Sequence, residues 1–350
     1  MKFLLLTLIV HAPDPITGRQ VSTQQRLQDV VEQAVVAEEL GYDGFAVGER
    51  HERPFISSSP PVILSHIAAK TRTIRLFTGV TTLSLLDPVR AFEDYATLDH
   101  LAQGRLDLMI GKGNGSAQRD LFNITEDDQW ERNRESYEVF RKLWQNNKIT
   151  WSGTIRPALD EAEVWPQPYQ PSIRVWHGSA TSKDSVDLAV RYGEPIFSAN
   201  VTHSVEPYQE LVEYYRAQWA AAGYRPEDAL VGAGSAGFLL RPTSQEARDL
   251  YRPVFQARHA ASGLWDSYED FLQRSSALIG SPAEITEKIL RYHAALGHEV
   301  MHLSADGDGL TSQMRREGLE LFQSEVAPKL RTAIPSRPLG TDTSTLVAQP

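Results

Sequence analysis

The fold class is decided by the stretch Glu38–Val47, which reads EELGYDGFAV. A helical pattern ends at Gly41, a short turn follows, and the compact apolar run Phe45–Val47 comes next. Glycine closes helices because it adopts the left-handed backbone conformation at low cost, and a short apolar run bounded by turn residues indicates a buried strand. Strands that are apolar on both faces are typical of parallel sheets covered by helices.

The same unit recurs at residues 101–110, 191–197 and 294–303, which predicts alternating strands and helices along the chain. We expect strands at residues 3–9, 44–48, 74–81, 106–110, 172–177, 195–199, 230–240 and 299–303. We expect helices at residues 24–40, 58–70, 88–102, 128–147, 182–192, 205–222, 282–296 and 311–331. This alternation predicts a closed (β/α)₈ TIM barrel with insertions at its C-terminal rim, in preference to an open doubly wound sheet.

Length and composition fit this architecture. The chain has 350 residues, of which 41% are hydrophobic and 23% charged, as in a globular protein with a large core. No linker rich in Pro, Gly or Ser divides it. We therefore expect a single barrel domain over residues 1–332 and a disordered tail over residues 333–350.

Charge and residue usage exclude several classes of function. The net charge is −10, from 35 Lys and Arg against 45 Asp and Glu, which disfavours nucleic acid as a partner. The absence of cysteine rules out disulfides, thiolate nucleophiles and iron–sulfur clusters. The run Phe3–Val10 resembles a short signal peptide, but His11 and Pro13 stand where a cleavage site would be. We expect a cytoplasmic protein that spans no membrane.

Two motifs match known signatures in the wrong context. His298–His302 reads H-E-x-x-H, a zinc motif when it lies on a helix, but Gly297 ends the preceding helix and the run reads as a strand. Gly232–Gly237 reads G-x-G-x-x-G, but a strand follows where a dinucleotide fold needs a helix. We expect no metal site, and we interpret Gly232–Gly237 as a strand whose small residues allow close packing.

Polar residues follow several predicted strands, at the end where such barrels carry their active sites. The residues are Glu49, Arg50, His51, Lys112, Gly113, Asn114, His177, Gly178, Ser179, Thr181, Ser182 and Ser198 to Asn200. Gly178 and the hydroxyls after it open a helix, so backbone N–H groups, hydroxyls and the helix dipole together suit a monophosphate, with Lys112 as counter-charge. An N-cap without a ligand is the alternative. Arg50 could instead pair with Glu49 or Glu52, His51 could be a surface loop residue, and His177 is expected to be a buried imidazole with a partner.

Nine short motifs in a fixed order carry a resemblance. They are Glu49-Arg50-His51, Thr78-Gly79-Val80-Thr81, Asp87-Pro88-Val89-Arg90, Glu93-Asp94, Leu98-Asp99, Gly104-Arg105, Gly111-Lys112-Gly113, Gly178-Ser179-Ala180-Thr181-Ser182 and Leu321-Phe322-Gln323-Ser324-Glu325-Val326. Together they resemble the bacterial luciferase-like flavin monooxygenases over residues 1–332. The resemblance implies a (β/α)₈ barrel that binds reduced FMN at its C-terminal rim.

The resemblance also assigns roles to single residues. It places the FMN phosphate on Ser179 and Ser182, with Thr181 between them, Gly178 offering its backbone, and Lys112 where the family has an arginine. It implies a cis peptide bond at Gly79-Val80 beneath the flavin ring, with Asn114 near the ring and Ser198 to Asn200 opposite. Of two adjacent family histidines, the first is replaced by Arg50, which argues against bioluminescence, and His51 keeps the second. We expect acid–base work from His51 and electrostatic stabilisation from Arg50.

The resemblance implies a two-component monooxygenase. A separate NAD(P)H:flavin reductase would supply FMNH₂, which reacts with O₂ at its C4a carbon, and the resulting peroxyflavin oxidises a small organic substrate. An F420-dependent hydride-transfer oxidoreductase and a non-catalytic flavin-binding family member stay open as alternatives. The family also implies a homodimer through residues 58–70 and 88–101, and a mobile lid in residues 243–280.

Overall fold

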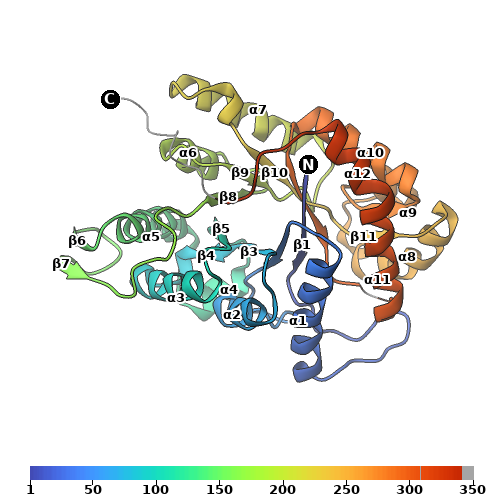
Figure 1. Cartoon of the computed structure of the whole chain (residues 1–350), viewed down its shortest axis with the longest axis horizontal. Helices are drawn as coiled ribbons and strands as arrows, with labels where there is room; N and C mark the ends of the chain where they lie inside the picture. The colour runs from blue at the N-terminus through green and yellow to red at the C-terminus, as the bar shows by residue number, and fades with distance from the viewer. Residues whose placement is uncertain (308, 341–350) are drawn as a thin grey trace.

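Strands and helices alternate along most of the chain (Figure 1), in a computed structural model that describes residues 1–307 and 309–340. Eight strand positions close into a parallel barrel because β1 pairs with both β2 and β13, and β3 pairs with β5. The barrel strands are β1 (Lys2–Thr7), β2 (Gly44–Val47), β3 (Arg75–Thr78) continued by β4 (Thr81–Thr82), β5 (Leu106–Gly111), β8 (Val175–Ser179), β9 (Ile196–Ser198), β10 (Val231–Ala233) and β13 (Val300–Ser304). The predicted (β/α)₈ barrel is confirmed.

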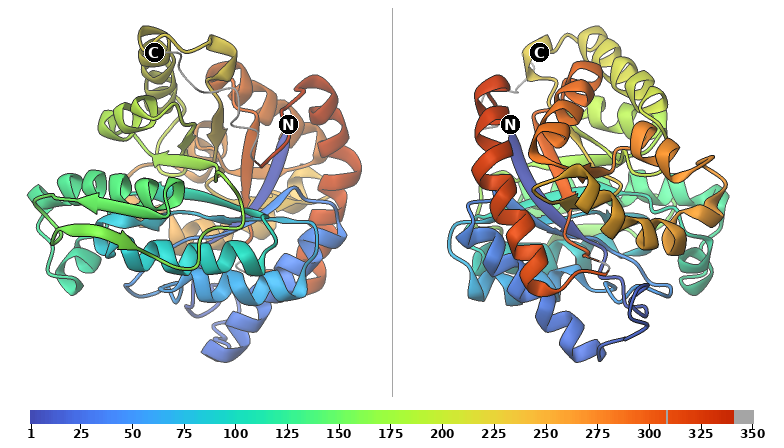
Figure 2. Two further views of the ribbon diagram at one scale, coloured as in Figure 1. Left: turned by 60° about the vertical axis from the view of Figure 1, so that its left-hand side comes forward. Right: turned by 90° about the vertical axis from the view of Figure 1, so that its right-hand side faces the viewer.

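Helices cover the outside of the barrel (Figures 1 and 2). They are α1 (Thr23–Glu39), α2 (Pro60–Lys70), α3 (Pro88–Leu101), α5 (Glu126–Gln145), α6 (Lys183–Arg191), α7 (Glu206–Ala221), α10 (Pro282–Leu296), α11 (Ser312–Leu321) and α12 (Ala327–Ala333). Local sequence sets their ends. The Asp87 side chain accepts hydrogen bonds from the backbone N–H groups of Val89 and Arg90 at the start of α3, and Gly297 ends α10 at φ 59°.

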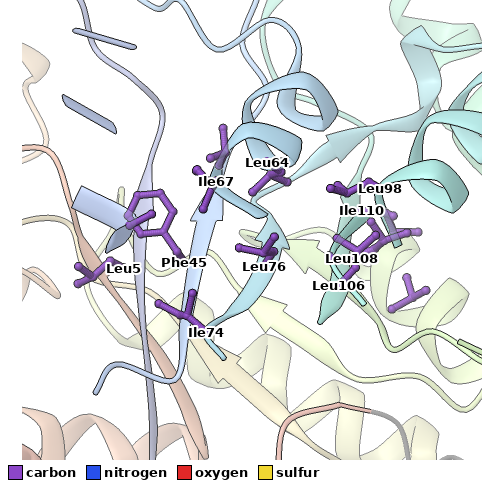
Figure 3. Packing of buried hydrophobic residues seen from close by; sticks show 14 of the residues in the cluster. Leu5, Phe45, Leu64, Ile67, Ile74, Leu76, Leu98, Leu106, Leu108 and Ile110 are labelled. Carbon is purple, nitrogen blue, oxygen red and sulfur yellow. The ribbon is translucent and has the colours of Figure 1, made fainter. Parts of the chain in front are cut away.

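Side chains alternate between two apolar layers. Outward residues such as Phe45, Leu76 and Leu108 pack against Ile67 and Leu98 of the helices (Figure 3). Inward residues fill the barrel itself, namely Leu4, Ala46, Phe77, Met109, Trp176, Phe197, Leu230 and Val300. Side chains alternate along a strand with a period of two, so the residue two positions after an inward residue also faces the barrel axis.

Two predicted strands and one predicted helix are interrupted. Residues 74–81 divide into β3 and the start of β4, with Gly79 and Val80 between them. Residues 230–240 do not form a single strand, because β10 ends at Ala233 and β11 (Phe238–Leu240) pairs with β12 (Leu278–Gly280) in a separate sheet. The chain leaves the barrel where the Ala236 N–H donates to the Ser276 hydroxyl. Residues 311–331 form α11 and α12 with a π-helical turn, Phe322–Val326, between them.

Several elements were not predicted because they lie outside the repeating unit. They are α4 (Ser116–Leu121), α8 (Ser244–Arg258), α9 (Tyr268–Arg274) and the hairpin of β6 (Lys148–Trp151) and β7 (Leu159–Glu163). Short 3₁₀ turns occur at Leu83–Leu85, Pro226–Asp228 and Ala260–Ser262. Within the predicted lid region, α8, α9 and β12 share an apolar cluster with Leu239 of β11, which attaches this region to the barrel rim. Mobility of this region stays a prediction.

The last described residues contact the end of the barrel at which its strands begin. Ile334 is buried, Leu339 packs against the barrel interior, and Arg337 pairs with Asp228 and Glu299. Residues 334–340 of the predicted disordered tail are therefore attached to the barrel, and the rest of that tail, residues 341–350, lies outside the described residues. None of the helices in the described part of the chain is long and apolar enough to cross a membrane.

Candidate active site

Val80 forms the centre of the barrel's C-terminal rim. It follows a cis peptide bond with Gly79, so the cis bond expected at this position is present. A Cβ atom added to Gly178 would lie 2.7 Å from Val80 Cγ1, and one added to Gly111 would lie 3.1 Å from Val80 Cγ2. The Val80 side chain therefore fills the space that glycine leaves on two neighbouring strands, and it offers an apolar floor at the mouth of the barrel.

Glycine recurs at the same level on other strands. Each of these glycines lies two residues after an inward-facing residue, or four in the case of Gly234, so each would point its side chain toward the barrel axis. The glycines are Gly48, Gly79, Gly111, Gly178 and Gly234. Their lack of side chains lets Leu8, Leu6 and His302 pack closely over Gly48, Gly79 and Gly234, as Val80 does over the other two.

The loop after β8 has the features of an anion site. Ser182 is the N-cap of α6, but its side chain makes no capping hydrogen bond, so its hydroxyl and the first N–H groups of the helix are available to a ligand. The Ser179 hydroxyl accepts from the Ser182 N–H at 3.1 Å and donates to the Ser182 carbonyl at 3.0 Å. Ser179 thus shapes the loop, while Ser182 and exposed Thr181 face solvent.

Lys112 lies across from this loop on the neighbouring strand. Ile110 of β5 pairs with His177 of β8, and continuing that register by two residues puts Lys112 opposite Ser179. Its ammonium lies 5.3 Å from the centre of the Trp130 ring and has no carboxylate partner among residues 1–307 and 309–340. A cation without an ion pair, on the strand next to the one that leads into an uncapped helix N-terminus, favours a bound anion.

His51 is held by a buried carboxylate. Its Nε2 lies 2.9 Å from Glu49 Oε1, and Glu49 Oε2 accepts from the Thr82 N–H at 3.0 Å. The ring also packs edge-on against Phe122, with the ring centres 4.8 Å apart. His51 is therefore an oriented, partly buried imidazole attached through Glu49 to β4, two residues beyond Val80. We did not expect from the sequence that Glu49 would orient His51, although Glu49 precedes His51 by only two residues.

Arg50 takes part in an ion pair and a hydrogen bond. It pairs with Glu52, donates to Asn114 Oδ1 at 2.9 Å, and places its guanidinium 4.8 Å from the centre of the Phe55 ring. The structure thus brings together two predicted site residues, Arg50 and Asn114, from different strands. The Arg50 Nε atom is buried without a hydrogen-bond partner among the described residues, and this leaves one donor free.

Buried polar atoms without partners gather on the opposite side of the rim. Among the described residues they include Ser198 Oγ, Asn200 Oδ1, Ser235 Oγ and His302 Nδ1. They come from the ends of three neighbouring strands, β9, β10 and β13. His302 stacks on Phe197, and burial lowers its pKa to about 4, so it is neutral. Sequence reasoning missed Ser235 and His302, although the alternation from Val300 marks His302 as inward-facing.

A cavity of about 340 Å³ lies between the rim and α8. Phe55, which stacks on Arg50, lines it together with Leu8, Phe238, Tyr251 and Val254. The cavity is of a size suited to a small organic molecule, and its wall is mostly apolar.

The two motifs that match known signatures lie on or next to strands, as predicted, and not on the helices that their signatures require. His302 lies on β13 and His298 precedes it, so H-E-x-x-H is not on a helix. A Cβ atom on Gly234 would lie 2.2 Å from His302 Nε2, which explains the small residues of Gly232–Gly237 as close packing. His177 has the expected buried partner, because its Nε2 lies 2.7 Å from Glu194 Oε2.

Comparison with known proteins adds a family match. The sequence model of the family described as "Luciferase-like monooxygenase" matches residues 1–299. The chain is 23% identical to the oxygenase component of flavin-dependent trigonelline monooxygenase from Acinetobacter baylyi, covering 92% of this chain and 94% of that protein. The match to uncharacterized protein y4vJ of Sinorhizobium fredii, 28% identical, spans about half of that protein, 51% of its length.

Two solved structures share the fold. Monooxygenase RslO1 from Streptomyces bottropensis superposes with a TM-score of 0.83 at 24% identity, covering 94% of this chain and 99% of that one. The oxygenating constituent of 3,6-diketocamphane monooxygenase from Pseudomonas putida, solved in complex with FMN, superposes with a TM-score of 0.77 at 21% identity, covering 94% and 98%. At these identities the likeness bears on the fold.

Proposed function

The chain belongs to the luciferase-like monooxygenase family, and from this premise we propose that it is the oxygenase component of a two-component, FMNH₂-dependent monooxygenase. In the overall reaction, one atom of O₂ enters a small organic substrate, the other leaves as water, and FMNH₂ is oxidised to FMN. Reduced FMN, when bound, supplies the activation of oxygen, and the protein supplies binding, orientation and exclusion of water.

The observation that carries this proposal is the anion site beside Val80. The uncapped Ser182, the N-terminus of α6 and unpaired Lys112 suit a terminal phosphate, while Val80 and the glycines around it leave a flat apolar floor. A flavin mononucleotide has these two parts, a phosphate and a planar ring. Lys112, Ser182 and Thr181, with the backbone after Gly178, would hold the phosphate, Ser179 would shape the loop, and Gly79-Val80 would support the ring.

Replacing Lys112 with alanine is expected to weaken FMN binding at least about tenfold and to leave riboflavin binding nearly unchanged, because riboflavin lacks the phosphate. Fluorescence titration of both flavins measures this. Lys70→Ala, an exposed lysine at the end of α2, is the matched control. Equal losses for FMN and riboflavin would overturn the assignment of the phosphate site.

His51 is proposed to move a proton near the ring. An imidazole can both accept and donate a proton, and the Glu49 carboxylate fixes the orientation of this one. Arg50 stays charged and is proposed to orient or stabilise an anion through its free Nε–H and its contact with Asn114. The cavity beside Phe55 is proposed to hold the organic substrate.

A separate NAD(P)H:flavin reductase is the proposed functional partner. The Acinetobacter baylyi relative is named as the oxygenase component of a flavin-dependent monooxygenase, which implies a second component in that system. Strand β11 follows the sequence that resembles a dinucleotide motif, where a dinucleotide fold needs a helix, and Gly234 within that sequence packs closely against His302. NAD(P)H is therefore expected to be consumed only when a reductase is added.

We propose a homodimer of single-domain chains (residues 1–332), formed through α2 and α3, in the cytoplasm. Ile67 of α2 and Phe92 and Leu98 of α3 are buried within the chain itself, so the dimer surface must come from exposed residues such as Val62, which is 68% exposed. Light scattering at micromolar concentration should give twice the mass of the chain, and Val62→Asp should reduce it. A monomeric wild-type protein would reject the dimer.

The F420-dependent and non-catalytic alternatives predict different ligand binding. F420-dependent enzymes share this fold, for example the tetrahydromethanopterin reductase of Methanopyrus kandleri, with a TM-score of 0.72 at 17% identity. Titrating the apoprotein with FMN, FMNH₂ and F420 distinguishes the proposed function from these two alternatives. Tightest binding of FMNH₂ supports the proposal, and preference for F420 contradicts it.

A further inference from the structure

A second cavity lies at the opposite end of the barrel from Val80. Its volume is about 400 Å³, and it is enclosed by α5, by Arg174 and Val175 where β8 begins, and by Pro195 just before β9. Ligands in a (β/α)₈ barrel enzyme normally meet the C-terminal ends of the strands, so a cavity at their N-terminal ends belongs to no part of the proposed reaction. Its size falls in the range of small-molecule sites.

Aromatic rings form one wall of this cavity. They are Tyr137, Phe140 and Trp144 on α5 and Tyr192 after α6. Tyr137 and Tyr192 meet edge to face with ring centres 5.4 Å apart, and Phe140 and Trp144 lie 5.6 Å apart at a tilt of 31°. These contacts fix the rings, so the wall is preorganised for a flat apolar ligand.

Three arginines line the same cavity, and two of them are already paired. Arg141 pairs with Glu194 at 3.2 Å, and Arg337 pairs with Asp228 at 3.4 Å. Arg174 forms no ion pair within the described residues, although Asp107 and Glu299 lie near enough to attract it, and it donates a long hydrogen bond of 3.5 Å to the Pro338 carbonyl. Burial lowers the pKa of Arg174, and the attraction of Asp107 and Glu299 offsets only part of that effect, so the charge of this guanidinium is incompletely compensated.

A second donor is also without a partner. Trp144 is 5% exposed, and its Nε1 atom is buried with no hydrogen-bond acceptor among the described residues. Buried indole N–H groups normally find an acceptor. The cavity thus combines an unpaired cation, an unpaired buried N–H donor and an aromatic wall.

We propose that this cavity is a second ligand site and that it binds a small aromatic carboxylate. The carboxylate accepts hydrogen bonds from the Arg174 guanidinium, with the Trp144 N–H as a further donor. The aromatic body of the ligand packs against the Tyr192 ring, which the buried Tyr137 ring holds in place from behind. Neutral aromatic molecules bind more weakly, since they form no ion pair with Arg174.

Calorimetric titration of the full-length protein with 2-naphthoate tests this proposal, with 2-naphthamide as the neutral isostere. Naphthoate should bind with a Kd below about 1 mM, and naphthamide at least about tenfold more weakly. Arg174→Gln should weaken naphthoate binding at least about tenfold. Arg134→Gln, on the exposed face of the same helix α5, is the matched control and should leave the affinity within about twofold.

Trp144→Phe keeps the aromatic ring and removes the N–H, so it should weaken naphthoate several-fold even if Arg174→Gln fails to fold. Saturating FMN should not displace naphthoate, because the two sites lie at opposite ends of the barrel. Equal binding of the amide, unchanged binding by both variants, or displacement by FMN would each overturn the proposal.

Discussion

Replacing His51 with glutamine is expected to slow reductase-coupled substrate oxidation at least about 100-fold while FMN affinity stays within a few-fold. Glutamine keeps the size and one hydrogen-bonding group but cannot accept and release a proton near neutral pH. The geometry supports a role in proton transfer, because Glu49 holds the ring at 2.9 Å and is itself fixed by the Thr82 N–H. Steady-state rates and flavin titrations on the same preparations give the two quantities.

His66→Gln is the matched control for this experiment, because His66 is exposed on α2. It should retain the wild-type rate. Light scattering checks that this variant keeps the oligomeric state of the wild type, since Val62 of the proposed dimer surface lies one helical turn away. A His51→Gln enzyme that turns over at the wild-type rate, or one that loses rate and FMN affinity in parallel, would contradict the assignment of proton transfer to His51.

The second large effect concerns stability and buried His302. Burial lowers the pKa of His302 from 6.5 to about 4, so the unfolded chain binds a proton more readily than the folded one. The stabilising contribution of neutral His302 is therefore complete above pH 6.5 and is lost as the pH falls toward 4. The loss in free energy of unfolding should reach about 2 kcal/mol by about pH 5 and about 3 kcal/mol near pH 4.

Urea unfolding of wild type and His302→Gln at several pH values measures this contribution. The glutamine variant should lose less stability than the wild type over the same interval, because glutamine does not titrate. The two proteins are compared by how steeply the free energy of unfolding changes with pH. Its absolute value is not compared, because the substitution itself changes it. An equal change of the free energy of unfolding with pH in the two proteins would show that burial does not lower the pKa of His302.

The barrel was predictable because its signal is local and repeated. Each helix that ends in glycine before an apolar run, as at Gly41 and Gly297, predicts its own strand without knowledge of the rest of the chain. The break between β10 and β11 was not predictable in this way. It depends on Ser276, some forty residues away, which accepts a hydrogen bond from the Ala236 N–H. Helices α8 and α9 likewise pack on each other and on β11 without following the repeat.

The candidate site could be predicted only in part, for a similar reason. Residues that directly follow strands, such as Lys112 and Ser182, were expected at the rim because strand ends meet there. The partners of these residues depend on three-dimensional contacts. The pairing of Arg50 with Asn114 joins residues 64 positions apart, and His302 faces Gly234 from a different strand. The local alternation of side chains marks His302 as inward, but it does not show that its Nδ1 lacks a partner.

The central claim is that this protein binds FMNH₂ and controls its reaction with oxygen. Rapid mixing of the anaerobic protein–FMNH₂ complex with O₂, followed by absorbance, tests it most directly. We predict a transient absorbance that belongs to neither reduced nor oxidised FMN and that outlasts the reaction of free FMNH₂ with O₂. Direct conversion of reduced to oxidised FMN at the rate of free flavin, with no transient, would contradict the claim.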